Sequence, residues 1–170
     1  EFYYEVYEKH NNLMWEKKLG LEQFSSGDEE IISELNEILQ SSEIDMTIFF
    51  RLLSSIGKPD VNDLKFAFYN EETIIETEWN NWLNKWWSRV EGNPDQEKMR
   101  LANPKYVLRN WMAQLAIDAA ENQDYSVAKE LYELLKEPYE EQLENEEKWF
   151  QKRPEWARHR VGCSMLSCSS

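Results

Sequence analysis

Large apolar side chains recur along this chain at spacings of three and four residues. The clearest case is a stripe in the segment 72–90, formed by Ile75, Trp79, Trp82, Trp86 and Val90. Such a stripe is typical of an amphipathic helix with one buried face. No convincing segment of five or more residues alternates apolar and polar side chains, as a half-buried strand would. The pattern therefore predicts an all-α protein, an irregular array of helices joined by short turns.

Residues that begin and end helices mark the early segments. Gly20 follows the aromatic-rich stretch 2–19 at the place where a C-capping glycine is common. Ser26 stands three residues before Glu29, the spacing of a capping box, in which the serine accepts a backbone N–H at a helix N-terminus. We therefore expect one helix over 2–19 and a second that starts near Ser26. The second helix is expected to bury one apolar face: Ile31, Ile32, Leu35, Ile38 and Leu39.

Asparagine, aspartate and proline mark the later boundaries. Asp45 can cap a helix that ends before Pro59, since proline cannot continue the hydrogen-bond ladder. Asn103 followed by Pro104 predicts another helix start, with asparagine as the N-cap and proline at the first helical position. Further helices are expected over 126–135 and 140–150.

The chain is strongly acidic. Its 33 Asp and Glu residues against 19 Lys and Arg residues give a formal net charge of −14. Attraction to phosphate backbones or to anionic lipid is therefore disfavoured over most of the surface. No apolar run approaches the roughly 18 residues of a membrane span. We expect neither nucleic acid nor a membrane to be a partner.

The expected organisation is one helical region, residues 1–152, followed by a flexible tail, residues 153–170. The chain starts with Glu1 inside a predicted helix and without an initiator methionine, so we expect it to be part of a longer protein. Its two cysteines, Cys163 and Cys168, both fall in the last eight residues. This position excludes a disulfide framework distributed along the chain.

Several segments together resemble the selenoprotein O family. The most specific is Asn103-Pro104-Lys105-Tyr106-Val107-Leu108-Arg109-Asn110, which continues through an alanine-rich stretch to Asp124-Tyr125-Ser126. Three supporting segments occur in the same order, over residues 17–21, 47–53 and 153–157. The chain also ends in Cys168-Ser169-Ser170, and that family closes with cysteine or selenocysteine and two serines. The resemblance spans the whole chain.

This resemblance implies the C-terminal helical part of a protein kinase-like enzyme. Such an enzyme transfers AMP from ATP to hydroxyl groups of proteins, with ATP and Mg²⁺ as cofactors of the full-length parent. Transfer of this kind needs a phosphate-holding loop, a lysine and metal-binding carboxylates, because catalysis is mostly positioning and charge stabilisation. The five glycines are scattered, and no Asp-Phe-Gly sequence occurs. We therefore expect no catalytic or metal-binding residue in this chain, no cofactor binding by the chain alone, and no activity of its own.

The resemblance also implies partners and a compartment. The expected partners are the kinase-like N-terminal region of the same protein and the protein substrates. Family analogy implies mitochondria for a eukaryotic parent and the cytoplasm for a bacterial one.

The tail cysteines are the candidate redox site. Arg158, His159 and Arg160 lie nearby in sequence, and their positive charge would favour the thiolate form. The resemblance places Cys168 where animal members of the family carry selenocysteine, which implies a redox role such as a reversible disulfide that controls the enzyme. The alternative is two inert thiols in a disordered tail. Because the spacing to Cys163 is not Cys-x-x-Cys, a further alternative is that Cys168 pairs with a cysteine outside this chain.

Asn103, Lys105 and Arg109 are candidates for an anion contact or for docking onto the kinase-like region. On a helix that starts at Asn103-Pro104, Lys105 and Arg109 would share one face near the N-terminus, where anions bind. The alternative, which we favour, is that they pair with carboxylates of this acidic chain or hold the helix against the kinase-like core. For the tryptophan stripe we likewise favour a buried core over a binding platform.

A hypothesis of a different class is a free-standing, non-catalytic helical interaction module. The segment 113–135 loosely resembles one tetratricopeptide-type helical pair. Such folds need about three or more repeats to bury their faces. No second copy occurs at the required period, so this hypothesis is the weaker one.

Overall fold

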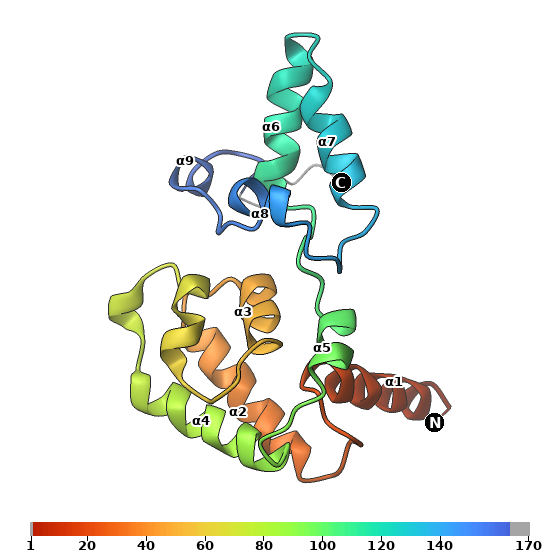
Figure 1. Ribbon diagram of the computed structural model, residues 1–170, viewed down its shortest axis with the longest axis vertical. Coiled ribbons are helices and arrows are strands. Elements are labelled where there is room, and N and C mark those ends of the chain that lie inside the picture. The colour runs from red at the N-terminus through yellow and green to blue at the C-terminus, as the bar shows by residue number, and fades with distance from the viewer. Residues whose placement is uncertain (1, 164–170) are drawn as a thin grey trace. The chain divides into compact units, whose positions relative to one another are not determined.

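The computed structural model describes residues 2–163 of the chain (Figure 1). Over these residues the regular structure is helical and no strand occurs, although an isolated bridge pairs Ile44 with Phe68. The all-α prediction is confirmed. The chain divides into two compact units, one ending at Asn103 and the other beginning at Pro104. This division falls inside the segment 1–152, which the sequence analysis treats as one region.

The first unit contains five α-helices and two 3-10 helices within its described residues. They are α1 (Phe2–Lys18), α2 (Asp28–Ser41), α3 (Met46–Leu53), η1 (Val61–Ala67), η2 (Glu71–Thr73), α4 (Glu76–Arg89) and α5 (Gln96–Ala102). The helices of the second unit are α6 (Asn110–Glu121), α7 (Ser126–Leu134), α8 (Leu143–Trp149) and α9 (Glu155–Arg158). The predicted helices over 2–19, 126–135 and 140–150 correspond to α1, α7 and α8. Helix α5, which is only seven residues long, was not predicted from the sequence.

Aromatic rings form the core of the first unit. Trp79, Trp82 and Trp86 on α4 are at most 1% exposed. The ring of Phe49 on α3 lies 5.4 Å from that of Trp79 and 6.3 Å from that of Trp82. The rings of Trp82 and Trp86 are stacked at 6.2 Å. The stripe is therefore buried core, and the alternative of a binding platform is wrong.

The indole N–H groups of this core also find acceptors. Trp82 donates to the backbone oxygen of Ile31 on α2 at 2.8 Å, and Trp86 donates to that of Leu19 at 2.9 Å. These bonds join α4 to α2 and to the end of α1, and α2 and α4 lie side by side (Figure 1). One residue of the predicted stripe does not belong to it: Ile75 precedes α4 as its N-cap and is 51% exposed.

The start of α2 differs from the predicted capping box. The helix begins at Asp28 after Gly27, and its N-cap residue makes no side-chain hydrogen bond. A different pair makes the contact, because the buried carboxylate of Asp28 accepts hydrogen bonds from the backbone N–H and the hydroxyl of Ser25, at 2.7 and 3.0 Å. Asp28 also accepts two bonds from Arg89 on α4, at 2.6 and 3.0 Å. A long-range ion pair therefore fixes this end of α2.

Replacing Asp28 with asparagine is expected to lower the free energy of unfolding by about 2 kcal/mol, because hydrogen bonds to a buried charged group are among the stronger ones. Burial raises the pKa of Asp28, but the bonds from Arg89 and Ser25 outweigh it and leave the pKa below its ordinary value. The stabilisation is therefore complete above the ordinary aspartate pKa and is lost as pH falls through the lowered folded-state pKa. Urea denaturation across acidic pH should show this loss in the wild type and not in Asp28→Asn. The exposed Asp63→Asn serves as the control.

The predicted helix start at Asn103-Pro104 is wrong. Asn103 is the C-cap of α5, and the next helix begins only at Asn110. The segment between them is held by other contacts, since the backbone N–H groups of Lys105 and Tyr106 both donate to the backbone oxygen of Pro138, at 2.9 and 3.1 Å. These bonds to a distant residue replace the local helical ones.

Gly20 confirms the predicted C-capping glycine. Its φ of +66° lies in the left-handed region, and a Cβ atom there would come within 2.7 Å of the Met99 sulfur. Gly20→Ala is therefore expected to lower the free energy of unfolding by about 2 kcal/mol, from the left-handed backbone and the close contact together. Gly57→Ala is the matched control, because nothing lies within 4 Å of a Cβ atom at Gly57. Equal urea midpoints for the two variants would contradict the prediction.

In the second unit, α6 and α7 pack together as a helical hairpin (Figure 1). The ring of Trp111 on α6 stacks on that of Trp149 on α8 at 6.0 Å. Arg160 donates to both carboxylate oxygens of Asp118 on α6, at 2.8 and 2.7 Å. Helix α9 and Arg160 lie in the first part of the segment 153–170, for which a flexible tail is expected from the sequence.

Candidate functional site

Asn103 is a structural residue of the first unit. Its side chain is buried and bonds to two other elements. The oxygen accepts from the ammonium of Lys18 at 2.8 Å, and the amide nitrogen donates to the backbone oxygen of Lys18 and to the Ser54 hydroxyl, at 3.1 and 3.3 Å. Arg51 donates to the backbone oxygens of Arg100 and Asn103, each at 3.2 Å. Asn103 thus ties the end of α5 to α1 and α3.

Lys105 belongs to the second unit and is enclosed by acceptors. Its side chain is 3% exposed, and its ammonium donates to carboxylate oxygens of Glu141 and Glu146 at 2.9 and 2.7 Å. A third bond, at 2.9 Å, reaches the backbone oxygen of Glu141. Lys105 is thus paired with carboxylates of its own unit, and a role in docking onto the kinase-like region stays a prediction.

Arg109 is the N-cap of α6, with an extended backbone and a half-buried side chain. Because no helix runs from Asn103, Lys105 and Arg109 do not share the helix face on which the anion contact was predicted. Asn103 and Lys105 also fall in different units. The structure thus removes the geometric reason for treating these three residues as one anion site.

Cys163 is the part of the candidate redox site that the structure describes. Its thiol is free and its side chain is only 7% exposed. Of the nearby cations, Arg160 pairs with Asp118, and Arg158 lies 3.8 Å from Glu155. Burial limits access of oxidants to a thiol. Cys168 lies outside the described residues, so a disulfide that involves it stays a prediction.

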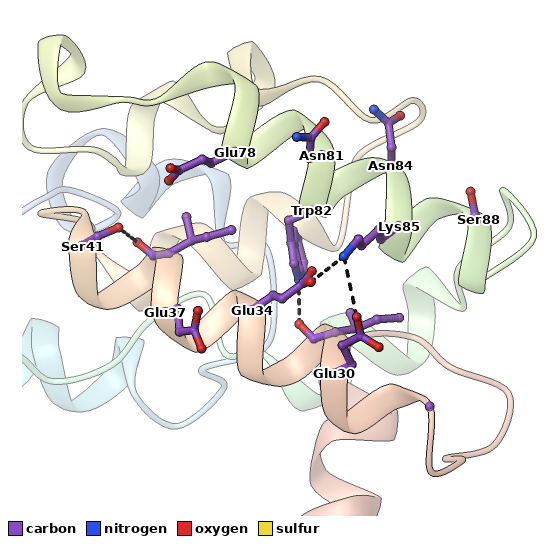
Figure 2. A pocket seen from close by; sticks show the side chains of 13 residues that line it. Glu30, Glu34, Glu37, Ser41, Glu78, Asn81, Trp82, Asn84, Lys85 and Ser88 are labelled. Carbon is purple, nitrogen blue, oxygen red and sulfur yellow. Dashed lines mark hydrogen bonds and ion pairs between the residues drawn. The ribbon is translucent and has the colours of Figure 1, made fainter.

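A groove lies between α2 and α4 (Figure 2). Its volume is about 1080 Å³. The acidic side chains along it are Glu30, Glu34, Glu37 and Glu78. Lys85 reaches from α4 across to Glu34, with which it forms a hydrogen-bonded ion pair, and lies 3.9 Å from Glu30. Its hydrogen bond to Glu34 raises the pKa of Lys85 above the ordinary value.

The charge of this groove does not fit the triphosphate of ATP. Carboxylates would repel a triphosphate, and the cation that faces them, Lys85, is already paired. Over residues 2–163, no group of three or more His, Cys, Asp or Glu side chains is placed to hold a metal ion. We therefore assign no catalytic step to the groove.

This groove was not predicted from the sequence, although the sequence carries a signal for one of its walls. Glu30, Glu34 and Glu37 follow one another at spacings of four and three, so they share one face of α2. The facing wall is not predictable in the same way, because it depends on how α4 packs against α2. Only the tertiary structure brings Lys85 to Glu34, 51 residues away in sequence.

None of the helices between residues 2 and 163 is long and apolar enough to cross a membrane.

The family model and the curated relatives that match this chain point to one family. The family model described as protein adenylyltransferase SelO matches residues 1–136. A protein nucleotidyltransferase YdiU of Flavobacterium johnsoniae is 49% identical over 92% of this chain and 32% of its own length. Proteins with the same name from Aromatoleum aromaticum and Tolumonas auensis are 41% and 42% identical over the whole of this chain and 34% of their own length. The chain thus spans about a third of the length of the curated relatives it matches.

Proposed function

The chain belongs to the SelO family of protein adenylyltransferases, and on that premise we propose that it is a helical accessory region of a longer enzyme that transfers AMP to proteins. The observation that carries the proposal is the match to the family model over most of the chain. The parent would use ATP and Mg²⁺ and would adenylylate Ser, Thr or Tyr hydroxyls. Its nucleotide-binding groups would lie in a kinase-like region outside these 170 residues.

The geometry of the described residues supports this division of labour. The α2/α4 groove carries the wrong charge for a triphosphate. Two of the side chains considered for an anion contact make bonds within their own units, Asn103 in the first and Lys105 in the second. We therefore propose that this chain contributes structure and contacts to the kinase-like region, and that it neither binds ATP nor transfers AMP alone.

Two finer parts of the proposal concern regulation and compartment. We propose Cys168 as the redox-active residue of the tail, because Cys163 is buried. The relatives named above are bacterial, and for a bacterial parent we propose the cytoplasm. The rival hypothesis, a free-standing interaction module, gains no support from these comparisons.

The decisive experiment compares two labelled forms of ATP. The full-length parent is incubated with protein substrates, Mg²⁺ and ATP labelled either at the α-phosphate or at the γ-phosphate. Label from the α-phosphate alone is expected on protein, since adenylylation releases the other two phosphates as pyrophosphate. Transfer from the γ-phosphate would mean phosphorylation and would contradict the proposal, as would failure to transfer either label.

The same assay tests the finer parts. The 170-residue chain alone is expected to transfer no label. In the full-length parent, Cys168→Ser should remove any difference in AMP transfer between reduced and oxidised enzyme, whereas Cys163→Ser should not. An unchanged redox response in Cys168→Ser would exclude Cys168 as the regulator.

A further inference from the structure

Helix α1 has an apolar face that the described structure leaves uncovered. None of its residues is buried, although it is 17 residues long. At 3.6 residues per turn, six of the seven exposed large apolar side chains of α1 fall on one side of the helix, and Tyr4 lies off that side. The six are Phe2, Tyr3, Val6, Tyr7, Leu13 and Met14, which are 39–81% exposed. We call this surface the α1 face.

The α1 face is not the side by which α1 is attached to its own unit. Trp15 packs on Phe50 with ring centroids 6.2 Å apart, and the Lys18 ammonium bonds to Asn103. Trp15 lies roughly opposite the centre of the α1 face by helical periodicity. The helix therefore has two faces with apolar side chains. The face that carries Trp15 and Lys18 has its partners within the first unit.

The composition of the face is that of a contact surface. Tyrosine and other aromatic side chains are enriched in protein interfaces, where they bury a large area. Tyr3 and Tyr7 are already stacked on each other, with ring centroids 6.4 Å apart, which reduces the freedom that they would lose on binding. The spacing from Phe2 to Met14 corresponds to about 18 Å of helix, at about 1.5 Å per residue.

The charges on the face distinguish between occupants. The ionisable residues that periodicity places there are His10 and Lys17, with Lys9 at the edge and no carboxylate among them. The whole chain carries a net charge of −14, which opposes association of two copies through mutual repulsion. The family model matches from residue 1, and about two thirds of each curated relative lies outside the matched part. A large part of the family's chain is thus available to cover this face.

We propose that the α1 face is the docking surface for the remaining part of the same SelO-family chain, packing within one molecule. This inference rests on the proposed function in one respect, that the chain belongs to a longer parent. It goes further in naming the surface and in excluding a second copy as its occupant.

Side-chain oxidation by hydroxyl radicals, read by mass spectrometry, tests the proposal. The full-length parent, the 170-residue chain and each protein in denaturant are compared at Tyr3, Tyr7 and Met14. In the parent these residues are expected to be protected to the level of Met99, which is fully buried. In the 170-residue chain they should stay reactive at every protein concentration.

Two outcomes would overturn the proposal. Reactive Tyr3 and Tyr7 in the parent would mean that nothing in that chain covers the face. Protection in the 170-residue chain that grows with its concentration would mean that a second copy covers it. Because oxidation is read without AMP transfer, a parent that protects the face but transfers no AMP would refute the proposed function and leave the docking surface intact.

A substitution gives an independent measurement. Tyr7→Asp places a charge on the face, at a side chain that is 60% exposed. It is expected to leave the melting temperature of the 170-residue chain unchanged and to lower that of the parent. The same variant in the shorter chain is the matched control, and an equal effect in both proteins would contradict the proposal.

Discussion

Replacing Trp86 with alanine is expected to lower the free energy of unfolding of the first unit by about 3–5 kcal/mol. The indole is fully buried, stacks on Trp82 and donates its N–H to the backbone oxygen of Leu19 at 2.9 Å. The substitution would leave a cavity and an unpaired backbone acceptor in the same place. Domains of this size are stable by only about 5–15 kcal/mol. The variant should therefore lose a large part of the stability of its unit.

Two other variants separate the cost of the cavity from the cost of the lost hydrogen bond. Trp86→Phe keeps most of the ring but loses the bond to Leu19, so it is expected to cost about 1–2 kcal/mol. Trp87→Ala, at the adjacent half-buried position on the same helix, is expected to cost about 1 kcal/mol. Urea denaturation followed by circular dichroism gives the three values. A Trp86→Ala variant no less stable than Trp87→Ala would show that the aromatic core does not depend on this ring.

The tryptophan stripe shows what periodicity can predict. The spacing of Trp79, Trp82 and Trp86 predicts a helix and its buried face, because a helix places every third or fourth residue on one side whatever it packs against. The same rule failed at Ile75, which lies just outside the helix. Gly20 was predictable for a similarly local reason, since a left-handed residue after a helix favours glycine.

The segment 103–110 shows where local rules stop. Asn-Pro is a good helix start by preference, but Asn103 uses its side chain to hold α1 and α3, and Lys105 and Tyr106 bond to Pro138. These partners are distant in sequence, so no local pattern contains them. The same applies to Asp28, whose partner Arg89 is 61 residues away. The α2/α4 groove depends on such pairings too, so only its α2 wall was visible in the sequence.

The second large effect is expected at Lys105. Its buried ammonium makes three hydrogen bonds, two to the carboxylates of Glu141 and Glu146 and one to a backbone oxygen. The double variant Glu141→Gln, Glu146→Gln removes both negative charges and leaves the cation buried. We expect it to cost about 3 kcal/mol, because an uncompensated buried charge is strongly destabilising. Hydrogen exchange of the α8 peptides measures this loss within the second unit.

Replacing the lysine instead of the two glutamates should cost less stability. Lys105→Met leaves the side chains of Glu141 and Glu146 behind, but these are 54% and 46% exposed and can be solvated. We expect a cost of about 1 kcal/mol, since an apolar side chain of similar size often replaces a buried ion at little cost. Adding Lys105→Met to the double variant should restore most of its lost stability. If the triple variant is less stable than the double one, the buried charge is not the cause.

Alkaline pH provides a test of the same network without a substitution at the carboxylates. Burial lowers the pKa of Lys105, but the hydrogen bonds to Glu146 and Glu141 outweigh it and leave the pKa above the ordinary lysine value. The folded state therefore holds this proton more tightly than the unfolded state does. The stabilisation is complete below the ordinary lysine pKa and disappears as pH rises through the higher folded-state pKa. Exchange protection of α8, compared at matched intrinsic rates, should fall over this range in the wild type and stay level in Lys105→Met. Parallel curves for the two proteins would show that some other group controls alkaline unfolding of the second unit.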